Sequence, residues 1–68
     1  MKTRLVIGIL EKNGFSCVRI RGSHLQYKGY NPLNGNLVVT TVAGHNGEVH
    51  LINIRSIEKQ SGVKLLKK

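Results

Sequence analysis

The chain has 68 residues, and eleven Lys and Arg residues against three acidic residues give a formal net charge of +8. This length predicts one small domain over residues 1–68, and the charge favours an anionic partner such as nucleic acid or an acidic protein. Because all three acidic residues are Glu, a two-metal carboxylate nuclease, a carboxylate-pair glycosidase and a Ser-His-Asp triad are hard to build.

The cysteine count and the apolar runs indicate the cellular setting. Cys17 is the single cysteine, so no intramolecular disulfide can form, and a reducing, cytoplasmic location is expected. The apolar run at residues 5–10 is too short for a signal-peptide core or a membrane span, so we expect no membrane partner.

The first predicted element is a helix over residues 3–13. Thr3 is a candidate N-cap, and Gly14 is a typical helix stop. Apolar residues recur between them at helical spacings, at Leu5, Val6, Ile9 and Leu10.

Two strands are predicted next, over residues 15–21 and 24–28. Apolar and polar residues alternate in both, which is typical of half-buried strands. Gly22-Ser23 is a turn signal, and so short a connection requires an antiparallel hairpin. The positions expected to face the core are Val18, Ile20, Leu25 and Tyr27.

The second half of the chain predicts a loop, a strand, a turn and a helix, over 31–36, 37–42, 43–48 and 53–61. Asn53 is the candidate cap of that helix, Ile54 and Ile57 its core-facing residues, and Gly62 its stop. The tail after it either folds back or frays. The expected fold class is therefore α+β in the order α-β-β-β-α, a three-stranded antiparallel sheet with both helices on one face.

Such a sheet leaves its second face to the residues that alternate with the core positions. In the hairpin these are Arg19, Arg21, His24, Gln26 and Lys28. One interpretation is a solvated basic face without a specific role. The other is a phosphate-binding cluster, because four of the five side chains can carry positive charge on adjacent strands.

His24 gives that cluster a possible chemistry. Imidazole exchanges protons near neutral pH. Cleaving RNA without a metal requires a base for the 2′-hydroxyl proton, an acid for the leaving 5′ oxygen and cations for the phosphorane charge. One His with nearby Arg and Lys residues can supply the first and third. The competing interpretation is a surface His without a function.

The remaining candidate constellations are weak. His45, His50 and Cys17 do not have a known metal-ligand spacing, so no metal site is predicted. The glycines do not form a phosphate-cradling motif, and no cofactor is expected. Tyr27 is in phase with Leu25 and is predicted to lie in the core, whereas Tyr30 is the better candidate for base stacking. With three aromatic residues in the chain, a full single-strand-binding surface is not predicted.

Four sequence blocks resemble the HicA family of small toxins. They are residues 10–15 (LEKNGF), 19–24 (RIRGSH), 42–45 (VAGH) and 54–62 (IRSIEKQSG). Their order and spacing are similar to those of the family from residue 1 to about residue 63. The sequence departs from the family pattern in two places. Ala43 stands where the family has a Pro, and Ile52-Asn53 stands where the family has the residues that usually open its last helix.

The resemblance implies a double-stranded-RNA-binding-domain-like fold, metal-independent cleavage of mRNA and neutralisation by an acidic HicB-type antitoxin. It also implies that His24 is the catalytic residue. The residues we then expect to contact RNA are Arg19, Arg21, Ser23, Lys28 and His45. The alternative function is a non-catalytic double-stranded-RNA-binding or antitoxin-binding domain of the same fold.

Overall fold

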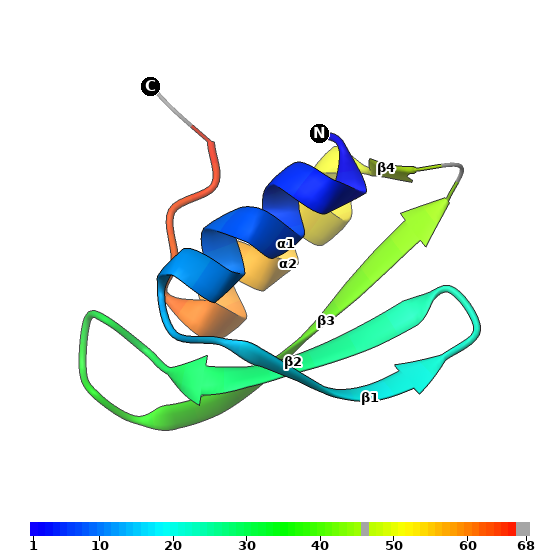
Figure 1. The fold of residues 1–68 in the computed structure, drawn as a ribbon. Helices are drawn as coiled ribbons and strands as arrows, with labels where there is room; N and C mark the ends of the chain where they lie inside the picture. Colours follow the sequence, from blue (N-terminus) through cyan, green and yellow to red (C-terminus); the bar gives the residue numbers. More distant parts are fainter. Residues whose placement is uncertain (46, 67–68) are drawn as a thin grey trace.

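The computed structural model describes residues 1–45 and 47–66, apart from the side chain of His45. The chain forms an α+β domain with two helices and a four-stranded antiparallel sheet, whose strand order is β1-β2-β3-β4. Both helices cover the same face of this sheet (Figure 1). The elements are α1 (Thr3–Lys12), β1 (Ser16–Arg21), β2 (His24–Tyr30), β3 (Leu37–His45), β4 (Glu48–Val49) and α2 (Leu51–Ser61).

The core lies between the sheet and the two helices. Val6 and Leu10 of α1 and Ile57 of α2 are completely buried, as the helical spacing of the apolar residues predicts. Tyr27 of β2 is 5% exposed and points into this core, which confirms its predicted place, and burial raises the pKa of its phenol. Neither helix of the described chain is long and apolar enough to cross a membrane.

The prediction of three strands was wrong, because a short fourth strand follows β3. Residues predicted as a turn extend β3 to His45, and Glu48–Val49 then pairs back against it. The N-terminus completes this edge: the amide of Val49 donates to the carbonyl of Met1 at 2.8 Å, and a β-bridge joins Lys2 to Glu48. A two-residue strand has no readable periodicity, so it becomes evident only from its pairing with β3 and with the N-terminus.

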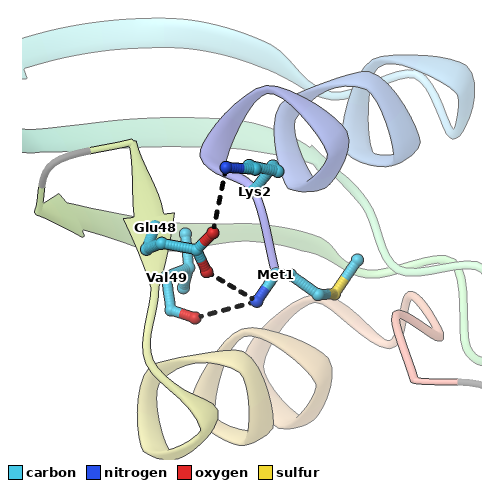
Figure 2. A network of polar contacts seen from close by, with 4 residues as sticks. All are labelled: Met1, Lys2, Glu48 and Val49. Carbon is cyan, nitrogen blue, oxygen red and sulfur yellow. Dashed lines mark hydrogen bonds and ion pairs between the residues drawn. The ribbon is translucent and has the colours of Figure 1, made fainter.

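Glu48 ties the N-terminus to this edge of the sheet (Figure 2). Its carboxylate lies 3.3 Å from the terminal ammonium group and 3.5 Å from the ammonium group of Lys2. The hydrogen bond from the terminal ammonium is the main reason that the pKa of this carboxyl is lowered. The β4 edge is therefore closed by the start of the chain, whereas β1 forms the other edge of the sheet.

The prediction that Val18 and Ile20 face the core was also wrong. They are 54% and 68% exposed. A β-bulge between Cys17 and Arg19 interrupts the alternation, so Val18 is an extra residue in the strand. The edge strand also lies away from the helices, which pack chiefly on β3.

Both predicted helix caps differ from the structure. Lys2, not Thr3, is the N-cap of α1, and α2 begins at Leu51, two residues before Asn53. The Asn53 side chain instead joins α2 to β3, since its Oδ1 accepts from the Ala43 amide at 2.8 Å and its Nδ2 donates to the Thr41 carbonyl at 3.3 Å. A tertiary contact therefore uses the polar group that the local pattern predicts as a cap.

The tail after α2 folds back onto the core. Gly62 ends the helix in the left-handed conformation, with φ of 74°. Val63 and Leu65 are then buried. One carboxylate oxygen of Glu58 accepts hydrogen bonds from the amides of Leu65 and Leu66, at 2.7 and 2.9 Å, and these bonds lower the pKa of Glu58.

Candidate functional site

The sheet face opposite the helices is open. Along β2 the buried Tyr27 and Gly29 point toward the helices, so the residues between them point the other way. These outward positions are His24, Gln26, Lys28 and Tyr30, followed on β3 by Leu37, Val39, Thr41 and Ala43. We call this surface the outer face.

The strand pairing places the basic residues of β1 beside His24. Arg21 lies directly opposite His24, and Arg19 directly opposite Gln26. On the other side of β2, Gln26 pairs with Thr41. Together these side chains line a shallow hollow of about 220 Å³ whose walls are Arg19, Arg21, His24, Gln26 and Thr41.

A two-residue turn fixes the register of β1 and β2, the two strands that provide most of the walls of the hollow. Gly22 adopts φ of 57°, a left-handed conformation that tight hairpin turns require. The carbonyl of Ser23 accepts a hydrogen bond from the amide of Gly44 at 3.3 Å, which ties the turn to β3. Because Arg21 and His24 flank this turn, the hairpin itself sets their side chains opposite each other.

The hollow is cationic, and among residues 1–45 and 47–66 no acidic side chain lines it. Glu48 binds the N-terminus, Glu58 binds the tail amides, and Glu11 lies on α1. The two guanidinium groups of Arg19 and Arg21 therefore face solvent in a concave surface beside an imidazole. Arginine in this setting favours phosphate, which it can bind through two parallel hydrogen bonds.

The predicted site residues are only partly brought together. Arg19, Arg21 and His24 share the hollow, but Lys28 lies farther along the outer face, opposite Ser16 and Val39. Ser23 contributes a backbone contact in the turn and does not line the hollow. His45 is the last residue of β3, and its side chain lies outside the described part of the structure.

The predicted RNA contacts did not include two wall residues, Gln26 and Thr41, although Gln26 was placed on the same sheet face as the basic residues. Gln26 was detectable, because it alternates in phase with His24 on one strand. Thr41 was not, because its place depends on how β3 pairs with β2 across the loop at 31–36. Within the described residues, no three His, Cys, Asp or Glu side chains gather as a metal site.

The arrangement supports two kinds of chemistry. The guanidinium groups can bind an anion, and the Gln26 amide and Thr41 hydroxyl add neutral hydrogen-bonding groups. His24 can accept or donate a proton at the same place. The hollow therefore holds side chains that are chemically suited to anion binding and to proton transfer.

Comparison with known proteins identifies the family. The model of the family described as "HicA toxin of bacterial toxin-antitoxin" matches residues 3–63, a range that includes both helices, all four strands and every wall residue of the hollow. Searches of curated proteins and of solved structures found no match. The chain belongs to the HicA family of toxins from bacterial toxin–antitoxin systems.

Proposed function

We propose that this toxin is an endoribonuclease that cleaves mRNA, with His24 as its catalytic residue. The observation that carries the proposal is the hollow on the outer face, where the His24 imidazole lies opposite Arg21 and shares the walls with Arg19, and no described wall residue is acidic. Membership of a toxin family supports the same conclusion, because such toxins are generally ribonucleases. The order of helices and strands is compatible with a double-stranded-RNA-binding-domain-like fold.

The proposed reaction uses the groups of the hollow and no metal. His24 accepts the proton of a ribose 2′-hydroxyl, and the 2′ oxygen attacks the adjacent phosphorus. The bond from phosphorus to the 5′ oxygen breaks, and the imidazolium formed in the first step is available to protonate that oxygen. Arg19 and Arg21 stabilise the charge that develops on the phosphorane oxygens.

The positive net charge that favours RNA binding also favours an acidic protein partner. A chain with a net charge of +8 is complementary to an acidic HicB-type antitoxin, and such a partner would compete with RNA for the cationic outer face. The single cysteine is compatible with a cytoplasmic location. In this proposal the antitoxin neutralises the toxin by covering the hollow.

The catalytic role is tested by cleavage of a structured mRNA in the presence of EDTA. His24→Ala and His24→Gln should each lower the cleavage rate by about 10²–10⁴-fold, the contribution of a general acid–base group. Both variants should retain the wild-type melting temperature, because His24 is exposed. If wild-type protein leaves the RNA intact, or if the His24 variants cleave normally, the proposal fails.

The phosphate contacts are tested by the salt dependence of RNA binding. Arg21→Gln should lower the slope of log Kd against log salt by about 1, since one phosphate contact is lost. Arg4→Gln is the matched control, because it removes the same charge from an exposed position on α1. Equal slopes for the two variants would contradict a specific role for the hollow.

A further inference from the structure

The outer face carries an apolar patch at the end opposite to the hollow. Tyr30, Leu37 and Val39 are 65%, 52% and 46% exposed, and we call these three residues the outer patch. Tyr30 lies directly opposite Leu37, and Val39 lies opposite Lys28 in the neighbouring row. An exposed apolar cluster on a small basic domain indicates a binding surface.

The patch and the hollow form one continuous surface. His24 and Tyr30 are three two-residue steps apart on β2, a separation of about 20 Å. Gln26 and Lys28 lie between them and point the same way. The outer face therefore runs from two arginines and an imidazole, past a lysine, to an exposed aromatic ring.

Tyr30 is the aromatic residue that is available to a ligand. The chain has three aromatic residues, and the other two, Phe15 and Tyr27, are buried at 2% and 5% exposure. The loop after Tyr30 is held by hydrogen bonds from the Asn31 amide to the Asn36 carbonyl and from the Gly35 amide to the Asn31 carbonyl, at 2.8 and 2.7 Å. The ring is thus presented from the end of a paired strand with an ordered turn behind it.

We infer that Tyr30 is a stacking site for an unpaired nucleobase of the RNA whose phosphate occupies the hollow. Leu37 supplies apolar surface beside the ring, and Lys28 lies between the two sites, where it can contact the intervening backbone. Stacking of a base on an aromatic ring beside cations that contact the backbone is a common way of binding unpaired nucleotides. The charge along this face favours RNA over an apolar protein segment.

The inference rests on the proposed function and concerns the form of the substrate. A base within a duplex is already stacked on its neighbours and cannot lie on the ring. The toxin should therefore prefer a single-stranded segment that extends beyond the cleaved phosphate. Tyr30 would then act in binding and not in proton transfer.

The test measures binding of fluorescein-labelled, uridine-rich RNA of about twelve nucleotides, within the span that one such domain covers. All proteins carry His24→Ala so that the RNA stays intact. Tyr30→Ala should raise Kd by about 5- to 100-fold, whereas Tyr30→Phe should remain close to the parent, because the ring is retained. Leu33→Ala is the matched control, since Leu33 is 82% exposed and borders the C-terminal tail instead of the outer face.

Two further measurements separate stacking from other effects. Tyr30→Ala should leave the slope of log Kd against log salt unchanged, because stacking releases no counterions, whereas Lys28→Gln should lower it. The loss caused by Tyr30→Ala should be absent for a fully paired duplex of the same sequence. Thermal unfolding of each variant checks that the substitution leaves the fold intact.

The outcomes distinguish this inference from the proposed function. If Tyr30→Ala binds the single strand as tightly as Leu33→Ala while the RNA still binds through the hollow, the stacking site is wrong and the proposed function stands. If Tyr30→Ala weakens duplex and single strand equally, stacking of an unpaired base is refuted. If it leaves RNA binding unchanged but weakens inhibition by a HicB-type antitoxin, the outer patch is a protein interface. If the parent binds neither RNA, the proposed function itself fails.

Discussion

Glu58 connects α2 to the C-terminal tail, and its replacement by Gln should destabilise the whole domain. One carboxylate oxygen accepts from the amides of Leu65 and Leu66 at 2.7 and 2.9 Å. Glutamine can still accept these bonds, but as a neutral group. Hydrogen bonds to a charged group contribute about 1.5–3 kcal/mol each, against about 0.5–1.5 kcal/mol for neutral ones, so the two bonds together should lose about 2 kcal/mol.

The consequence is large because the tail completes a small core. Val63 and Leu65 are 2% and 6% exposed, so release of the tail also exposes apolar surface. In a domain of this size, about 2 kcal/mol lowers the melting temperature by about 8–16 °C. Circular dichroism during thermal and urea unfolding measures both quantities. Glu11→Gln is the control, since it neutralises an exposed carboxylate on α1.

The pH dependence tests the same interaction in a second way. The pKa of Glu58 is lower in the folded chain than its unfolded value of about 4.3, so its contribution is fully present above that pH. The contribution is lost as the pH falls through the folded pKa, and the wild type should lose more stability there than Glu58→Gln. Glu48 also has a lowered pKa, but it is present in both proteins and cancels. If Glu58→Gln and Glu11→Gln unfold within about 0.5 kcal/mol of each other, the tail contact is not what stabilises the fold.

Three other substitutions test the packing and one hydrogen bond between α2 and β3. Gly29→Ala would place a methyl group 2.7–2.9 Å from ring carbons of Phe15 and should cost about 1–3 kcal/mol in urea unfolding. Gly8→Ala meets nothing within 4 Å and should stabilise α1 by about 0.5–1 kcal/mol; a loss of stability there would contradict the described helix packing. Asn53→Ala removes the acceptor of the Ala43 amide and should cost about 1–2 kcal/mol, with faster hydrogen exchange at that amide. Unchanged exchange would show that the amide has another partner.

Elements with a long, regular pattern were predictable from the sequence. The first helix was predicted over residues 3–13 and observed over Thr3–Lys12, and the hairpin turn at Gly22-Ser23 was predicted correctly. Arg21 and His24 could be placed opposite each other for the same reason, because a two-residue turn leaves little freedom of register. The local sequence of the hairpin therefore predicts the positions of most residues that line the hollow.

Features that depend on distant contacts were not predictable. The fourth strand has only two residues, and it pairs with the end of β3 and with the N-terminus, where Met1 lies 47 residues from Glu48. The exposure of Val18 and Ile20 depends on a bulge and on where the helices lie, and neither leaves a signal in the alternation of apolar residues. Thr41 enters the hollow through the pairing of two strands separated by a loop. In each case the local pattern identified the type of residue but did not determine its place in the fold.

The sheet separates the parts of the chain that provide stability from those that provide the proposed activity. The residues that build the core lie on the helix side, whereas Arg19, Arg21 and His24 belong to the exposed outer face. The positive charges of Arg19 and Arg21 repel one another and gain little from packing, so the fold retains them against a modest electrostatic cost. An anionic ligand removes this cost, and it should raise the melting temperature in proportion to the logarithm of its concentration above Kd. Substitutions in the hollow should therefore change binding and cleavage while leaving the unliganded domain as stable as before, or slightly more stable.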